Sequence, residues 1–406
     1  MATRVTTLLI LAAFGSGAVA CSSPESSGKT TGHGTTTKTD DTSSAASCDP
    51  NDPKIPCIKD VAEPCGNDYH TDYAGDELCL KPPKNGFQLH VGPDDYTDPD
   101  AVTPWILPPG GFPGQGPDTN FCYYMKSPND NDIYSSGYIA HMRPGSHHYI
   151  MFAVQGDVPD STGPDSCALR NSQIAGGANF ISGATREVQD ATMFGDAPED
   201  VGLGMPLAGK QQLNMNLHFV NIGDAPVLEE IWVNLLDEPA DEVTTTVKAI
   251  EWLGGLTMSI PPHQNQTLES PATGCTSPKD IDSVRVLGVT AHMHANTVRV
   301  SMYRQAAGAT DRDLIFDDFS WSEPTVWRFN SQITNPMPDR DTAKSGAPFS
   351  GILNATPQDT FSWECQVENK TDSTLTFSDK AYTGEMCNIF GMYASPVAKA
   401  PWSCYF

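Results

Sequence analysis

Strict alternation between apolar and polar residues is the feature that most constrains the fold of this chain. It is clearest in residues 213–220 and 289–296. In the first segment, the apolar residues Leu213, Met215, Leu217 and Phe219 alternate with Asn214, Asn216 and His218. In the second, Val289, Ala291, Met293 and Ala295 alternate with Thr290, His292, His294 and Asn296. Because successive side chains of a β-strand point to opposite faces, both segments are predicted to be half-buried strands with a polar outer face.

The composition favours the same class of structure. The chain has 406 residues, which is enough for two domains with cores of their own. Only 18% of the residues are charged, and the 34 glycines and 33 prolines are typical of turn-rich β-structure. No long segment has the periodicity of a helix. We therefore expect an all-β protein with two consecutive antiparallel, jelly-roll-like β-sandwiches over residues 85–245 and 246–406, divided near the run 238–242.

The acidic balance of the chain excludes some partners. The formal net charge is −26, and the acidic residues are spread along the sequence. Such a surface repels nucleic acids and anionic membranes, so we discount both as partners.

The N-terminus has the features of an export signal. Arg4 precedes an apolar run at residues 8–19, and the small residues 18–20 form a cleavage site directly before Cys21. A signal that is cleaved before a cysteine resembles those of bacterial lipoproteins, in which the cysteine carries the lipid. We therefore expect residues 1–20 to be removed and the exported protein to be lipid-anchored through Cys21, at the outer membrane, in the periplasm or at the cell surface. Plain secretion is the alternative, because position 18 is Ala rather than the usual Leu.

Cysteine usage agrees with export. The chain has 11 cysteines, and ten remain when Cys21 is set aside. An even number in an exported chain predicts five disulfides. Four of the ten lie within residues 48–84, which we interpret as a disulfide-stapled segment whose pairing cannot be deduced from the spacing. Residues 21–47 are rich in Ser, Thr and Gly and are predicted to form a flexible tether.

Five of the ten histidines occur in three tight clusters: His147 with His148, His218 alone, and His292 with His294. Residues two apart leave the same side of a strand, so His292 and His294 can reach one metal ion. Neighbours in a regular strand point apart, so His147 and His148 can share an ion only at a strand end or through different ring nitrogens. Together the clusters predict a metal site, but imidazole suits Zn, Cu, Fe and Ni alike.

A thioether ligand would decide between these metals, because sulfur prefers Cu(I). The chain has 13 methionines, and the ordinary role of a methionine is to fill the core. Counting therefore does not select a ligand methionine.

The order of the motifs resembles that of the copper type II, ascorbate-dependent monooxygenases, which include the peptidylglycine α-hydroxylating and dopamine β-monooxygenases. The matching motifs are His147-His148, then His218, then His292-Met293-His294, then Glu385-Met386-Cys387-Asn388. The resemblance covers residues 118–406. It implies one copper, which stores and delivers an electron, on His147, His148 and His218. It implies a second copper, where O2 binds and the substrate is oxidised, on His292, His294 and Met386.

The same resemblance implies an activity and its cofactors. Two copper ions per chain, O2 and a one-electron donor such as ascorbate would hydroxylate a C–H bond of a small organic substrate. The two coppers would face a solvent-filled gap between the domains. We expect a monomer. The disulfides that the resemblance implies are Cys122–Cys167, Cys275–Cys404 and Cys365–Cys387.

Positions around the second implied copper differ from those of the peptide-amidating enzyme. Where that enzyme has an arginine that holds the substrate carboxylate, this chain has Thr290, and a tyrosine is replaced by Phe390. Asn388 is retained. Losing the arginine removes the charged partner for a carboxylate. We therefore predict that Thr290, Asn388 and Phe390 lie beside a neutral or less acidic substrate, and that the reaction is not peptide amidation.

Two other functions would use the same histidines. A non-catalytic copper-binding or copper-storage lipoprotein on the same scaffold is suggested by the altered positions 290 and 390. A zinc-dependent hydrolase would leave Met386 without a role, and the histidine motifs contain no obvious glutamate base.

Overall fold

The computed structural model describes residues 71 and 73–406, except 111–116, 155, 157, 166, 168–178, 190–193, 196, 272–273, 279–280 and 398–399. The predicted export signal, the tether at 21–47 and Cys48, Cys57 and Cys65 lie outside the described residues. Nearly all regular structure in the described part is β-strand, which confirms the all-β prediction. The helical elements there are one turn each: η1 (Asp76–Leu78), α1 (Pro99–Val102), η2 (Thr103–Trp105) and η3 (Pro198–Asp200).

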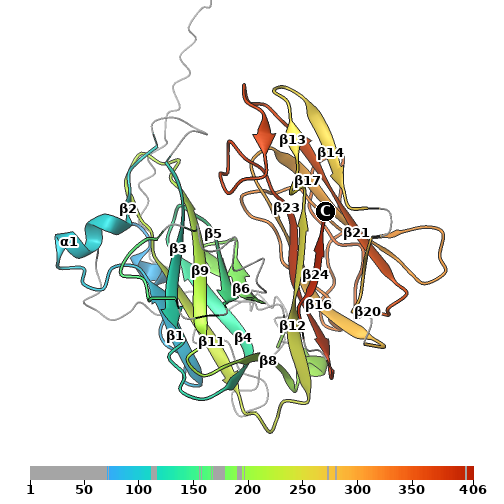
Figure 1. The fold of residues 1–406 in the computed structure, drawn as a ribbon, viewed down its shortest axis with the longest axis horizontal. Helices are drawn as coiled ribbons and strands as arrows, with labels where there is room; N and C mark the ends of the chain where they lie inside the picture. Colours follow the sequence, from blue (N-terminus) through green and yellow to red (C-terminus); the bar gives the residue numbers. More distant parts are fainter. Residues whose placement is uncertain are drawn as a thin grey trace, which may run out of the picture. The chain divides into compact units, whose positions relative to one another are not determined.

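The first sandwich consists of two sheets (Figure 1). One contains β1 (Gly86–Val91), β11 (Ile231–Glu238), β4 (Ile133–Met142), β7 (Val188–Gln189) and β8 (Leu203–Leu207). The other contains β3 (Asp118–Lys126), β9 (Gln212–Val220), β5 (Ser146–Ala153) and β6 (Asn179–Ala184). Apolar side chains of both sheets, such as Val233 of β11 and Leu217 of β9, share one core. A separate two-stranded sheet pairs β2 (Ile106–Leu107) with β10 (Val227–Leu228). In the sequence, β2 comes before β3 and β10 comes before β11.

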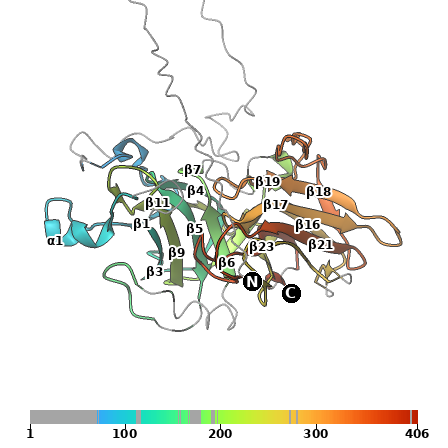
Figure 2. The same cartoon turned by 90° about the horizontal axis from the view of Figure 1, so that it is seen from above.

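The second sandwich also has two sheets (Figure 2). One contains β12 (Thr245–Gly254), β23 (Cys387–Ser395), β16 (Val284–Met293), β19 (Trp327–Arg328), β20 (Leu353–Ala355) and β24 (Trp402–Tyr405). The other contains β14 (Asn265–Glu269), β21 (Thr360–Glu368), β17 (Thr297–Gln305), β18 (Asp313–Asp318) and β15 (Cys275–Thr276). β13 (Ser259–Ile260) pairs with β22 (Leu375–Thr376). The core between the sheets is rich in aromatic rings, among them the stacked Trp252 and Trp363.

A parallel pairing joins the two sandwiches. Leu203 and Gly204 of β8 pair with Thr245 and Thr246 of β12, which makes one 11-stranded sheet from a sheet of each sandwich. The predicted dividing run 238–242 lies between the end of β11 and the start of β12.

Strand β23 is buried on both faces. Ile389 and Tyr393 belong to the core of the second sandwich, whereas Phe390, Met392 and Ala394 belong to the core of the first. Because side chains alternate along a strand, the sheet that contains β23 is covered by an apolar core on each side. The first sandwich therefore packs directly against a face of the second.

This packing corrects one prediction from the alternating segments. Both are strands, β9 and the end of β16, but neither has a solvent-exposed polar face. All nine residues of β9 are buried, and His292 and His294 are 4% and 0% exposed. The physical reason is that the polar faces of the two sandwiches face each other rather than water.

Disulfides link strands in both sandwiches. Among the described residues, Cys122 is bonded to Cys167, Cys275 to Cys404, and Cys365 to Cys387, which are the pairs that the resemblance implies. Cys79, the described cysteine of the predicted 48–84 segment, is also disulfide-bonded. Within the part of the chain that the structure describes, no helix has the length and apolar character needed to cross a membrane.

The close approach of β16 and β23 generates a prediction for stability. A methyl group added at Gly391 would lie 2.4 Å from the backbone oxygen of Gly288, so the strands would have to move apart. We expect Gly391→Ala to lower the free energy of unfolding by about 1–3 kcal/mol, as overpacking does elsewhere. Chemical denaturation measures the change. Gly163→Ala is the matched control, because no atom lies within 4 Å of the added methyl group. Equal stability of the two variants would contradict the packing described here.

Candidate metal centre

The first pair of histidines lies at an irregularity in strand β5. The register between β5 and β9 shifts between Ser146 and His148, so His147 is an extra residue on its strand. A β-bulge of this kind re-aims a side chain that regular alternation would send to the opposite face. As a result, both His147 and His148 are buried and their ring centroids are 5.1 Å apart.

His218 completes this group from the neighbouring strand. It pairs directly with His148 across β5 and β9. Its ring centroid lies 5.0 Å from that of His147 and 5.0 Å from that of His148. The three histidines that the resemblance assigns to one copper are therefore mutual neighbours.

The second pair comes from the other sandwich. His292 is near the end of β16, and His294 follows the last residue of that strand. Their ring centroids are 5.5 Å apart.

The two groups meet, which differs from the expected arrangement. The centroids of His148 and His292 are 4.6 Å apart, and those of His218 and His294 are 5.8 Å apart. One ligand nitrogen from each of His147, His218 and His294 can be chosen so that all three lie within 4.8 Å of one another. The expected solvent-filled gap is therefore wrong for this structure, because the polar faces of β5, β9 and β16 pack against each other.

Burial favours the neutral form of three of these imidazoles. It is the main cause that lowers the pKa of His147, His148 and His294 well below the usual value, and the neighbouring histidines lower it further. A neutral imidazole carries a lone pair and is the form that binds a metal ion.

Several ring nitrogens in the first group have no partner. His147 Nε2, His148 Nδ1 and His218 Nδ1 are buried without a hydrogen bond among the described residues. A buried polar atom left in this state costs about 1–3 kcal/mol. A metal ion held between His147, His218 and His294, whose ligand nitrogens can be chosen within 4.8 Å of one another, would give buried ring nitrogens a partner. The unpaired atoms of the adjacent His147 and His148 are different ring nitrogens, which is one of the two conditions under which neighbours were expected to share an ion. The residues therefore fit a metal.

Asp118 orients His218. Its carboxylate accepts a hydrogen bond from His218 Nε2 at 2.8 Å, which leaves Nδ1 facing the other histidines. The same carboxylate accepts one from the backbone N–H of Ala381 at 2.9 Å. Burial raises the pKa of Asp118, but His218, Lys380 and Ala381 together hold it below its usual value. A carboxylate behind a ligand histidine fixes its ring and its tautomer.

Glu385 ties the second histidine pair to Met386. Its fully buried carboxylate accepts hydrogen bonds from the backbone N–H groups of His294 (2.6 Å), Asn296 (3.1 Å) and Met386 (2.8 Å). Burial raises the pKa of Glu385 to about 7, although these bonds oppose the rise. The Cys365–Cys387 disulfide holds the residue after Met386 to β21. Both segments that carry the second ligand set are thus fixed to one carboxylate.

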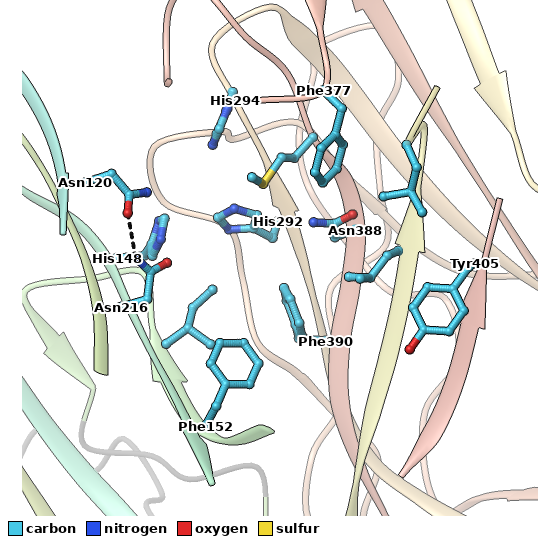
Figure 3. A pocket seen from close by; sticks show the side chains of 14 residues that line it. Asn120, His148, Phe152, Asn216, His292, His294, Phe377, Asn388, Phe390 and Tyr405 are labelled. Atoms are coloured by element: carbon cyan, nitrogen blue, oxygen red, sulfur yellow. Dashed lines mark hydrogen bonds between the residues drawn. The ribbon is translucent and has the colours of Figure 1, made fainter. Parts of the chain in front are cut away.

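A cavity of about 380 Å³ opens beside the histidines. Figure 3 shows His148 and Asn120 on one side of it and His292, Asn388 and Phe390 on the other. The residues that line it are Asn120, His148, Ile150, Phe152, Asn216, Leu253, Leu256, His292, His294, Phe377, Met386, Asn388, Phe390 and Tyr405. Met386 therefore lines the same cavity as His292 and His294.

The three predicted substrate residues are not all in this cavity. Asn388 and Phe390 line it, whereas Thr290 lines a separate cavity of about 20 Å³ that Phe390 and His292 also border. Thr290 pairs with Phe390 across β16 and β23. Thr290 and His292 leave the same face of β16, but Thr290 lies two residues further from the end of the strand and reaches only the small cavity, whereas His292 and Phe390 border both.

Sequence reasoning did not find Asp118, Glu385 or Trp321. The Trp321 ring lies 5.2 Å from that of His147 and 5.7 Å from that of Tyr382. Glu385 belongs to the motif that matches the family, but the motif does not reveal which groups its carboxylate binds. No spacing rule connects Asp118 with His218, which is 100 positions away. Strand β3 pairs with β9 so that Asp118 lies opposite Val220 and Asn120 lies opposite His218, which brings Asp118 near His218, and this register is visible only in the folded chain.

Comparisons with known proteins do not identify the chain. No model of a known protein family matches the sequence, and no curated protein matches it. A crystal structure of a BuGH86 variant in complex with neoagarooctaose matches with 6% identity and a TM-score of 0.13. The match covers 70% of this chain and 35% of that chain, so this chain spans about a third of its length. A likeness at this level carries no argument about fold or function.

The role of Glu385 can be tested by substitution. Glu385→Ala leaves three buried N–H groups without an acceptor, at a cost of about 1–3 kcal/mol each. We expect reduced stability and loss of metal at His292, His294 and Met386, with metal retained by the other three histidines. Glu385→Gln keeps one acceptor oxygen, so its effects should be smaller.

Chemical denaturation and metal content after copper loading measure the two effects. Glu251→Gln is the control, because Glu251 is also buried and accepts a hydrogen bond from the backbone N–H of Phe180. If Glu385→Ala lost stability but no more copper than the Glu251 variant, the positioning role would be refuted.

Proposed function

We propose that this protein is a copper-dependent monooxygenase. It hydroxylates a C–H bond of a small organic substrate with O2 and a one-electron donor such as ascorbate. The observation that carries the proposal is the convergence of five buried histidines, and of Met386 beside them, next to one cavity with largely apolar walls. This is the ligand set implied by the resemblance to the copper type II, ascorbate-dependent monooxygenases.

The chemistry of the ligands favours copper. Imidazoles alone leave the metal open, but the thioether of Met386 is a soft ligand that prefers Cu(I). In the proposed division, His147, His148 and His218 would hold one ion, and His292, His294 and Met386 would hold the other. Bound copper, which alternates between two oxidation states, supplies electrons to O2 one at a time.

The surroundings of the histidines disfavour a hydrolase. None of the residues that line the cavity is Asp or Glu, so the lining offers no carboxylate base to activate water. Phe152, Leu253 and Phe390 instead present apolar surface, which keeps water away from the reacting groups.

The stoichiometry of the reaction defines what the protein must accommodate. One oxygen atom of O2 enters the C–H bond as a hydroxyl group, and the other leaves as water, which consumes two electrons and two protons from the donor. Within this scheme, Asp118 holds His218 in its ligand tautomer, and Glu385 holds Met386 beside the His294 segment.

We also propose that the protein is exported and lipid-anchored through Cys21. The signal-like N-terminus and the disulfides support this location, because structural disulfides persist in oxidising compartments.

Substitution of Met386 tests the function. Met386→Leu keeps the volume of the side chain and removes the sulfur. We expect ascorbate-dependent O2 uptake to fall by roughly two orders of magnitude or more, because the substitution removes a proposed copper ligand. Copper on the other three histidines should remain. Oxygen consumption and copper content are measured on the same samples.

Met302→Leu is the matched control, because Met302 is buried in the core of the second sandwich and away from the cavity lining. Full activity of the Met386 variant would contradict the proposal. Copper uptake by the unaltered protein without O2 consumption, for any donor and substrate tried, would instead favour the copper-binding or storage protein.

A further inference from the structure

Among the described residues, none that lines the cavity beside the histidines has a charged side chain. Its lining residues include no Asp, Glu, Lys or Arg. The nearby carboxylates are already engaged: Asp118 by His218 and Ala381, and Glu385 by three backbone N–H groups. The side chains alone would therefore make a charged ligand lose its hydration without gaining an opposite charge, which is costly in a buried site.

Apolar surface continues from the buried end of the cavity to its mouth. Phe152 and Met386 are 5% exposed, whereas Leu256 and Tyr405 are 39% and 54% exposed. Large apolar side chains at the protein surface often mark a binding site when they adjoin a pocket. The cavity volume of about 380 Å³ lies near the lower end of the range for small-molecule sites, roughly 300–1,000 Å³. The site thus suits a small apolar molecule rather than a polymer.

One polar group is positioned to recognise such a molecule. The side-chain oxygen of Asn388 accepts a hydrogen bond from the backbone N–H of Gly254 at 3.2 Å. This bond turns the amide so that its nitrogen points toward His292 and the cavity (Figure 3). The nitrogen is a hydrogen-bond donor, so it matches a carbonyl or hydroxyl oxygen of a ligand.

We propose that the substrate of this site is an uncharged, mainly apolar compound with a ring or short chain and one hydrogen-bond acceptor. Its apolar part contacts Phe152, Phe377 and Phe390, and its acceptor faces Asn388. Calling this compound a substrate rests on the proposed function. The preference of the cavity for a neutral ligand depends only on the side chains that line it.

Three probes of similar size test the preference on the mature chain after its metal has been removed with a chelator, so that the side chains of the cavity alone decide the binding. They are 2-acetylnaphthalene, which is neutral, 2-naphthoate, which is anionic, and 2-naphthylmethylammonium, which is cationic. Equilibrium dialysis measures their dissociation constants. We expect the neutral probe to bind at least about tenfold more tightly than either ion. Equal or tighter binding of either ion would overturn the proposal.

Two variants locate the binding. Asn388→Leu should weaken 2-acetylnaphthalene roughly fivefold to tenfold, as expected for loss of one hydrogen bond, and leave 2-ethylnaphthalene unchanged. Leu253→Arg places a cation in the lining and should reverse the order of 2-acetylnaphthalene and 2-naphthoate. Ile222→Arg, which adds the same charge at an exposed position outside the lining, should leave the order unchanged. Probe binding that neither cavity variant alters would overturn the proposal.

Copper content and ascorbate-dependent O2 uptake, measured after the same preparations are loaded with copper, separate the two claims. A protein that binds the neutral probe but consumes no O2 contradicts the monooxygenase and supports the cavity preference. A protein that oxidises charged compounds better than neutral ones supports the monooxygenase and overturns the preference.

Discussion

The structure depends on one constraint, which is that polar strand faces of the two sandwiches are buried against each other. β5 and β9 contribute His147, His148 and His218, and the end of β16 contributes His292 and His294. Burial keeps several of these rings neutral, and three nitrogens of the first group have no hydrogen-bond partner among the described residues. Leaving such atoms unpaired is unfavourable, and a metal ion bound at the interface would accept lone pairs of the imidazoles.

The surrounding fold holds this interface together. The β8–β12 pairing joins one sheet of each sandwich, and alternate side chains of β23 enter both cores. Two carboxylates act at the interface itself. Asp118 of the first sandwich bonds His218 and the backbone of Ala381 in the second, and Glu385 fixes His294 and Met386 together. A weak, soft ligand such as a thioether needs this outside positioning, because its own bond to a metal does little to orient it.

Parts of this arrangement follow from the sequence, and parts do not. Alternation predicted β9 and the end of β16, and it placed His292 and His294 on one side of a strand. It could not show that the polar faces are buried, because periodicity within a strand does not reveal what covers it. The bulge at His147 depends on the register with β9, and Met386 is one of 13 methionines, so its selection came from the family resemblance. Thr290 was predicted to be beside the substrate, but it lines a small cavity that is separate from the one beside the histidines and that Phe390 also borders.

Copper-edge X-ray absorption on the natively purified, mature chain in its reduced form tests the central claim most directly. The account predicts two copper ions per chain, surrounded by imidazole nitrogens, with one sulfur scatterer from Met386. Copper with nitrogen ligands and no sulfur would contradict the assignment of Met386. A protein purified with zinc, or with no metal that it retains, would contradict the copper centre itself.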